Sequence, residues 1–133
     1  MASKCAVVLD TNVFVAAGFN PHSASARIIE EIRAGRLTLA WNEETRSESE
    51  AVVGRIPPLS WDHFVDLFEE DGRCEDTVRP EEMEYVPDPE DRKFAALARA
   101  VDAALITNDD DLLGSREQAD VCIVAPDEFF ERR

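Results

Sequence analysis

Residues 5–14, Cys-Ala-Val-Val-Leu-Asp-Thr-Asn-Val-Phe, decide how the rest of the chain is interpreted. Ala6 to Leu9 form an unbroken apolar run, which is typical of a strand buried on both faces of a parallel sheet. The run stops at Asp10, and Thr11 and Asn12 then provide side chains that favour the start of a helix. Because ligands of open parallel sheets bind beyond the carboxyl ends of the strands, Asp10 is a candidate site residue. The alternative is that Asp10 only caps the next helix.

The composition describes one globular domain over residues 1–133, with 44% hydrophobic and 32% charged residues. The net charge of -15 argues against nucleic-acid or membrane binding through a basic surface. A polyanionic substrate would need local help, most simply from divalent cations. No window approaches the ~18 apolar residues that span a bilayer, and no secretory apolar segment precedes the first strand. We therefore expect a cytoplasmic protein with no membrane association.

The three cysteines, Cys5, Cys74 and Cys122, form no CxxC pair, so the sequence does not support a zinc site. Cys5 and Cys122 lie in apolar, strand-like runs. We expect both to pack there as small hydrophobic side chains.

Strand-like and helix-like segments alternate along the chain. Further strands are expected over residues 37–41, 103–107 and 121–124, and 74–78 is compatible with a short edge strand. The main helices are expected over residues 13–17, 23–34, 43–53, 60–71 and 88–101, with a closing helix from 126. This alternation predicts an α/β fold, a three-layer α/β/α sandwich around a mostly parallel sheet of about five strands.

Two helices each offer one acidic candidate. Glu48 shares a helix face with Thr45 and Val52, so it is the glutamate of its helix best placed to turn towards the protein body. An exposed side chain is the default alternative. Asp91 precedes the buried position Phe94 by three residues, so it projects from the amino-terminal end of the buried face.

A second apolar run, residues 103–107, also ends in acid, at Asn108-Asp109-Asp110-Asp111. Adjacent aspartates repel one another unless they are solvated, hydrogen-bonded or bound to cations. If the two strands are neighbours, Asp10 and Asp109 meet, and nearby helices bring in Asp91 and Glu48. Crowded carboxylates suit Mg²⁺ or Mn²⁺, which activate water and stabilise the leaving oxygen of a phosphodiester displacement.

Four segments in this order resemble the PIN domain family. They are Val-Leu-Asp-Thr-Asn-Val (8–13), Glu-Glu-Thr-Arg-Ser-Glu (43–48), Asp-Pro-Glu-Asp-Arg-Lys-Phe-Ala-Ala-Leu-Ala (88–98) and Ile-Thr-Asn-Asp-Asp-Asp-Leu-Leu (106–113). The resemblance is strongest to small single-domain bacterial PIN proteins of the VapC type, and it extends to Ala-Pro-Asp-Glu-Phe-Phe at 125–130. It implies a Mg²⁺- or Mn²⁺-dependent ribonuclease, the toxin of a toxin–antitoxin pair, with a small antitoxin as partner and a homodimeric state.

The resemblance also implies roles for individual residues. The catalytic acids would be Asp10, Glu48, Asp91 and Asp109, and the metal ligands would be Asp10, Asp91 and Asp109 with Asp111 as an occasional further one. Asn12 would orient Asp10 or a water ligand of the metal, and Thr107 would support the strand end. The basic residues expected to position RNA phosphates are Arg27, Arg46, Arg92 and Lys93.

Two other interpretations stay open. A metal-dependent phosphohydrolase on another α/β scaffold would use similar acids, but Asp10-Thr11-Asn12 lacks the second Asp of a DxD nucleophile motif. A catalytically weak or inactive PIN-like interaction module is the non-enzymatic alternative. Residues 66–91 hold twelve Asp or Glu against two Arg, which fits a solvated connecting surface or a docking face for a basic partner.

Overall fold

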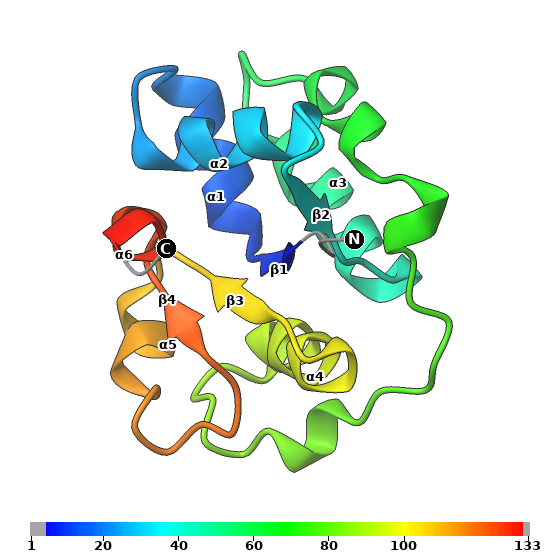
Figure 1. Ribbon diagram of the computed structural model, residues 1–133, viewed down its shortest axis with the longest axis vertical. Coiled ribbons are helices and arrows are strands. Elements are labelled where there is room, and N and C mark those ends of the chain that lie inside the picture. Colours follow the sequence, from blue (N-terminus) through cyan, green and yellow to red (C-terminus); the bar gives the residue numbers. More distant parts are fainter. Residues whose placement is uncertain (1–4, 132–133) are drawn as a thin grey trace.

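A parallel sheet with helices on both faces forms the centre of the computed structural model, which describes residues 5–131 (Figure 1). The four strands are β1 (Cys5–Leu9), β2 (Leu37–Leu39), β3 (Ala104–Ile106) and β4 (Ile123–Val124). Their order is β2-β1-β3-β4, and Val7 of β1 pairs with Leu39 on one side and Ala104 on the other. The predicted sandwich is confirmed, although the described residues form four strands rather than about five.

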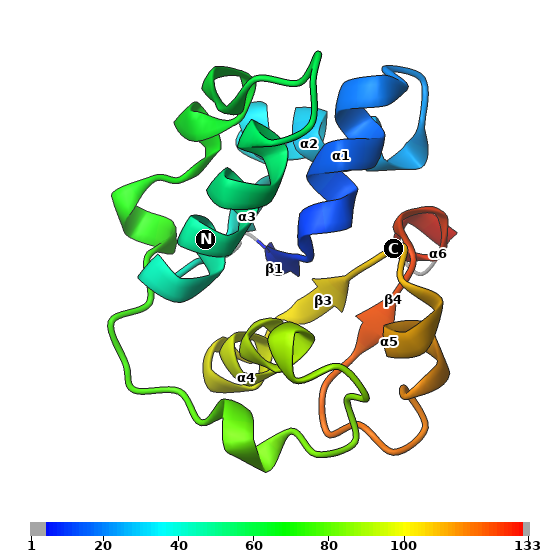
Figure 2. The same cartoon turned by 180° about the vertical axis from the view of Figure 1, so that it is seen from behind.

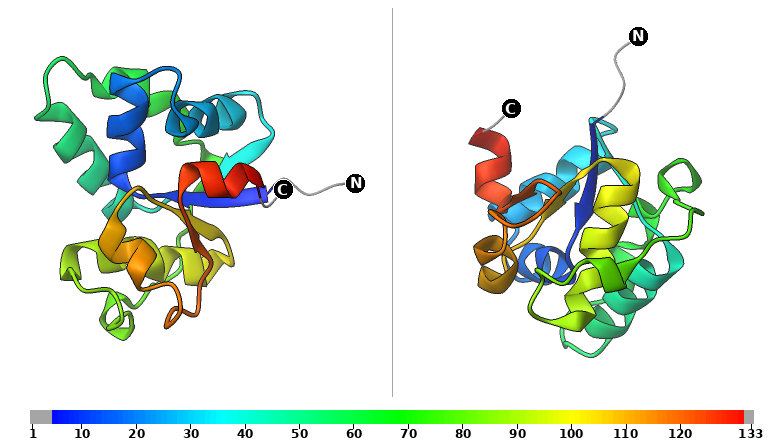
Figure 3. Two further views of the ribbon diagram at one scale, coloured as in Figure 1. Left: turned by 90° about the vertical axis from the view of Figure 1, so that its left-hand side faces the viewer. Right: turned by 90° about the horizontal axis from the view of Figure 1, so that it is seen from below.

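The central strand is buried on both faces because its apolar run does not alternate with polar residues. Val7 and Leu9 belong to one hydrophobic core and Val8 to the other. The first core is covered by α1 (Thr11–Phe19), α2 (Ala24–Arg33) and α6 (Pro126–Glu131). The second core is covered by α4 (Arg92–Val101) and α5 (Asp110–Gly114). Figure 3 (left) shows the sheet between these two layers.

Helix α3 (Glu43–Gly54) packs beside α1, as seen from behind in Figure 2. The helix begins with a reciprocal cap, in which the side chains of Asn42 and Thr45 each accept a hydrogen bond from the other residue's backbone N–H. The Asn42 side-chain oxygen accepts from the Thr45 N–H at 3.0 Å, and the Thr45 hydroxyl accepts from the Asn42 N–H at 3.1 Å. This reciprocal cap fixes the start of the helix that carries Glu48.

The prediction of a single helix over residues 60–71 is wrong. The segment forms three 3₁₀ turns, η1 (Trp61–His63), η2 (Val65–Leu67) and η3 (Glu70–Gly72). Trp61, Phe64 and Leu67 recur every three residues, which matches the three residues per turn of a 3₁₀ helix. Phe64 and Leu67 are buried in the first core, where Phe64 packs edge-on against Phe14 at 5.3 Å between ring centroids.

The sequence is compatible with a short edge strand over residues 74–78, but the described residues form no strand there. Arg73 makes one isolated bridge to Trp41, and the Cys74 N–H donates to the Trp41 carbonyl at 2.7 Å. The following residues, 75–77, are exposed, so no ladder continues. The chain then passes through η4 (Pro80–Glu82) and η5 (Pro89–Asp91) before α4.

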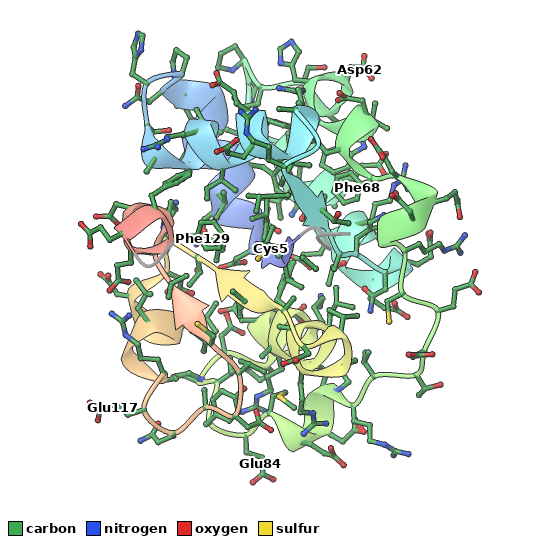
Figure 4. The ribbon with its side chains drawn as sticks, in the orientation of Figure 1. Cys5, Asp62, Phe68, Glu84, Glu117 and Phe129 are labelled. Carbon is green, nitrogen blue, oxygen red and sulfur yellow. The ribbon has the colours of Figure 1, made fainter. Side chains whose placement is uncertain are left out.

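Cys5 and Cys122 are exposed rather than packed, contrary to expectation. Cys5 is the first residue of β1, and Cys122 precedes the two-residue strand β4, so both lie outside the covered part of the sheet. Figure 4 shows the side chains around this framework, with Phe129 near α2 and Phe68 on the opposite flank. Among residues 5–131, no helix combines the length and apolar character needed to cross a membrane.

Candidate metal centre

Two neighbouring parallel strands, β1 and β3, end side by side and deliver acidic residues to the same edge of the sheet. Asp10 directly follows β1, and its N–H donates to the Ile106 carbonyl of β3 at 3.0 Å. Asp109 follows β3 after two residues. The carboxyl ends of parallel strands are where ligands bind in folds of this class, so both acids lie where a substrate could reach them.

Asp10 as a residue is only 5% exposed, and both oxygens of its carboxylate accept hydrogen bonds. Oδ1 accepts from the Thr11 N–H at 2.8 Å, which caps α1. Oδ2 accepts from Asn12 Nδ2 at 3.2 Å and from the Thr107 hydroxyl at 2.7 Å. Asp10 therefore caps α1 and also lies at the carboxyl end of β1, so its two interpretations do not exclude each other.

Thr107 connects the two strand ends. Its hydroxyl donates to Asp10 and accepts from the Asp109 N–H at 2.9 Å. Asp109 in turn caps α5, because its Oδ1 accepts from the Asp111 N–H at 2.9 Å. This chain of hydrogen bonds fixes Asp109 relative to Asp10.

Asp91 completes the group from a different element. It ends η5 and immediately precedes α4, but its side chain makes no capping bond to that helix. One carboxylate oxygen from each of Asp10, Asp91 and Asp109 lies within 4.8 Å of the others. The pKa of Asp91 is raised to about 7, mainly by burial and further by the nearby carboxylates of Asp10 and Asp109.

Burial is also the main cause of the raised pKa of Asp10. The hydrogen bonds from Thr107 and Thr11 oppose it, whereas the negative charges of Asp109 and Glu48 reinforce it. Anionic carboxylates at this spacing are unfavourable by themselves and become favourable beside a cation. Three clustered carboxylate oxygens are the donor set that Mg²⁺ and Mn²⁺ prefer, so these residues fit a divalent ion.

The three aspartates line a cleft of about 250 Å³. Its walls come from Asp10 and α1, from α3, from the end of η5 and the start of α4, and from the segment that follows β3. The lining residues are Asp10, Thr11, Asn12, Val15, Glu48, Val52, Asp91, Phe94 and Asp109.

Comparison with known proteins identifies the family of this chain. The family described as "PIN domain" matches residues 6–111. The chain belongs to the PIN domain family. Members of this family are generally nucleases, which supports a hydrolase acting on nucleic acid. No curated protein sequence matches the chain.

The solved structures similar to this PIN domain include two that cover at least 90% of both chains. The crystal structure of PAE2754 from Pyrobaculum aerophilum covers 98% of this chain and 97% of its own, with 16% identity and a TM-score of 0.61. The crystal structure of VapBC2 from Rickettsia felis bound to a DNA fragment from their promoter covers 90% of this chain and 98% of that chain. Its identity is 20% and its TM-score 0.61. At these identities the likeness establishes the fold alone.

In this PIN domain Glu48 lines the cleft but does not belong to the three-aspartate group formed by the described residues. Its Oε1 accepts from Lys93 Nζ at 3.0 Å. Asp111 is exposed and contributes its backbone N–H to Asp109, so its role as a metal ligand stays a prediction.

Sequence reasoning missed three polar contacts that hold the PIN domain's site together. The hydroxyls of Thr11 and Ser49 lie 2.9 Å apart in a buried position and join α1 to α3 next to Glu48. A serine four residues after Thr45, on the inward face of α3, was the available signal. Asn108 donates through its N–H to Asn12 Oδ1 and through Nδ2 to Ser25 Oγ, both at 3.0 Å. No sequence pattern indicated the Ser25 contact.

The four basic residues expected to contact RNA are spread over this PIN domain. The Arg27 guanidinium lies 4.0 Å from the centre of the Phe130 ring. Arg46 pairs with Glu50 at 3.6 Å. Arg92 Nε donates to the Val86 carbonyl at 2.9 Å. Of the four, Lys93 contacts a cleft residue, and RNA binding by any of them stays a prediction.

Proposed function

We propose that this PIN domain is a metal-dependent endoribonuclease that hydrolyses RNA phosphodiester bonds at the cleft. The observation that carries the proposal is the convergence of Asp10, Asp91 and Asp109 within 4.8 Å at the ends of β1 and β3 and the start of α4. These three residues would hold Mg²⁺ or Mn²⁺, with Asp111 as an additional ligand. When bound, such an ion acts as a Lewis acid and lowers the pKa of water.

The chain's own residues have separate tasks in this proposal. Asn12 and Thr107 hold Oδ2 of Asp10 in a fixed direction. Glu48 supplies a fourth catalytic acid on the wall of the same cleft. A divalent cation would offset most of the negative charge of the three aspartates, which eases the approach of a phosphodiester to a protein of net charge -15. Arg27, Arg46 and Arg92 are proposed to contact flanking phosphates.

The test is isothermal titration of Mn²⁺ into the wild type and into Asp10→Asn/Asp109→Asn, followed by an RNA-cleavage assay of both. We expect saturable binding and Mn²⁺-dependent cleavage in the wild type. The double variant is expected to lose binding and at least roughly a hundred-fold in cleavage rate, because two of three ligands no longer carry charge.

The matched control is Glu84→Gln/Glu117→Gln, which also removes two negative charges. Both glutamates are exposed and project from the periphery of the molecule in Figure 4. The control is expected to bind Mn²⁺ like the wild type. Equal titration curves for the wild type and both double variants would show that Mn²⁺ only decorates an acidic surface, and the proposal would be wrong.

The proposal includes a biological role as the toxin of a toxin–antitoxin pair, with a small antitoxin protein as partner and a homodimeric state. It is supported by the family resemblance and by the similarity of fold to the VapBC2 structure. Induced expression of the wild type is expected to arrest growth, whereas Asp10→Asn is not. Sedimentation equilibrium of purified Asp10→Asn tests the homodimer directly, and a monomer at micromolar concentration would contradict it.

A further inference from the structure

Lys93 bridges the two helices that flank the cleft. It lies in the first turn of α4, two residues after Asp91. Its ammonium is 3.0 Å from Oε1 of Glu48 on α3 and 3.4 Å from Oε2 of Glu90 in η5. The Lys93 and Glu48 side chains are 21% and 31% exposed, so this pair is better shielded from solvent than most surface ion pairs.

Glu48 depends on Lys93 for its position. Within residues 5–131, Lys93 is the only hydrogen-bonding partner of the Glu48 carboxylate. The backbone beneath it is fixed by the buried Thr11–Ser49 contact, but that contact does not restrain the Glu48 side chain itself. Without Lys93, the flexible Glu48 side chain would be free to turn away from this wall of the cleft.

The positive charge of Lys93 also affects the candidate acids of the site. In the described part of the chain, it is the one cationic side chain that pairs with any of the four candidate acids. Glu48 is close enough to Asp10 to raise the pKa of that carboxyl. By offsetting the charge of Glu48, the ammonium reduces the repulsion among the four acids.

We propose that Lys93 is a positioning residue for Glu48, and that it holds this carboxylate beside the cation site instead of contacting RNA phosphate. The inference rests on the proposed nuclease function. It assigns three aspartates to the cation and leaves Glu48 on the neighbouring wall. The phosphate contact expected from the sequence is the competing role for Lys93.

Mn²⁺ titration of four proteins tests the inference without using activity. They are the wild type, Lys93→Met, Glu48→Gln and Lys93→Met/Glu48→Gln. Lys93→Met removes the positive charge that offsets Glu48, so the surroundings of the ion become more negative even if Glu48 changes its orientation, and we expect Mn²⁺ to bind more tightly, on the order of five-fold. Removing both charges is expected to return the affinity to within about two-fold of the wild type. Lys93→Arg keeps the positive charge and is expected to behave like the wild type.

Steady-state RNA cleavage separates positioning from phosphate contact. Lys93→Met is expected to lower kcat by about ten-fold with little change in KM, because Glu48 loses its orientation. In the Glu48→Gln background the same substitution is expected to have no further effect on kcat. A phosphate contact would instead raise KM in both backgrounds and reduce the salt dependence of binding by nearly one counterion.

Arg99→Met is the matched control. Arg99 lies on the same helix and is ion-paired with Glu82 and Asp120, away from the cleft, so its loss is expected to change neither Mn²⁺ affinity nor kcat. An unchanged Mn²⁺ affinity in Lys93→Met, or a change confined to KM, would overturn this inference alone. Absence of Mn²⁺ binding in all four titrated proteins would overturn the proposed function, and this inference with it.

Discussion

The Thr107 hydroxyl lies 2.7 Å from Oδ2 of Asp10, although the two residues are 97 positions apart in the chain. The same hydroxyl accepts the N–H of Asp109, so one buried side chain sets the spacing of two candidate metal ligands. The sheet makes this possible, because β1 and β3 are adjacent and parallel and end at the same level. Thr107 therefore couples the stability of the sheet edge to the geometry of the cleft.

Replacing Thr107 by valine is expected to lower the free energy of unfolding by about 1–3 kcal/mol, since Asp10 and the Asp109 N–H both lose a buried partner. The pKa of Asp10 is expected to rise further, because the Thr107 hydrogen bond lowers it. Mn²⁺ affinity should fall as a result. Urea unfolding and Mn²⁺ titration at neutral pH measure both effects. Thr107→Ser keeps the hydroxyl and serves as the control; equal losses in the two variants would contradict this role.

The raised pKa of Asp91 predicts how stability depends on pH in the absence of metal. Between its unfolded pKa near 4 and its folded pKa of about 7, the folded state holds a proton that the unfolded state has released. The free energy of unfolding should therefore fall as pH rises through this interval and level off above it. Asp91→Asn removes this dependence. Its advantage over the wild type should grow to about 1–2 kcal/mol at pH 8, after allowance for solvent screening of a half-buried group.

Urea unfolding at pH 5 and pH 8, in the presence of a chelator, measures this difference. A constant gap between the wild type and Asp91→Asn would show that the Asp91 pKa is not raised. Mn²⁺ binding to the wild type at pH 6 is also expected to release protons, because the bound form requires an ionised Asp91. Titration in two buffers with different ionisation enthalpies detects those protons.

The buried hydroxyl pair of Thr11 and Ser49 predicts a non-additive response to substitution. Ser49→Ala leaves the Thr11 hydroxyl buried without its partner 2.9 Å away, which is expected to cost about 1–2 kcal/mol. Thr11→Val removes the other hydroxyl at nearly constant volume. The double variant should be less destabilised than the sum of the two single variants, because no polar group is then left unpaired. Strict additivity in urea unfolding would mean that the contact contributes nothing.

Gly72 allows η3 to lie directly against β2. A Cβ at this position would be 2.0 Å from the Leu39 carbonyl oxygen, and that backbone is fixed by pairing with β1. Gly72→Ala is therefore expected to destabilise the protein by about 3 kcal/mol or more. Gly54 ends α3, and a Cβ added there would meet no atom within 4 Å, so Gly54→Ala is expected to stabilise by up to about 1 kcal/mol. Thermal unfolding of both variants gives the comparison.

Local rules were sufficient for the parts of the fold that are determined within one segment. The apolar run before Asp10, the Asn42 cap and the inward phase of Glu48 all follow from neighbouring residues. The meeting of Asp10 with Asp109 needed one further assumption, that their strands are adjacent, and the sheet order bears it out.

Features that depend on distant partners were beyond sequence reasoning. Ser25 and Ser49 look like ordinary helix residues until Asn108 and Thr11 are placed beside them. The segment over residues 60–71 has helical apolar spacing, and three of its rings, Trp61, Phe64 and Phe68, pack on Phe14. The chain nevertheless forms separate 3₁₀ turns there, which the spacing of apolar residues does not distinguish from one helix. The possible edge strand over residues 74–78 was mispredicted for a similar reason. Arg73 pairs with Trp41 in one isolated bridge, and the pairing does not continue.

The placement of β3 has a consequence for how the protein comes into being on the ribosome. β1 and β2 are available once residue 39 has emerged, but β3, Thr107 and Asp109 lie beyond residue 103. An incomplete chain that ends before residue 104 has Asp10 without its hydroxyl donor and without the third carboxylate. The candidate cation site is thus assembled only after residue 109 has emerged, and under the proposed function chains shorter than this cannot cut the messenger that encodes them.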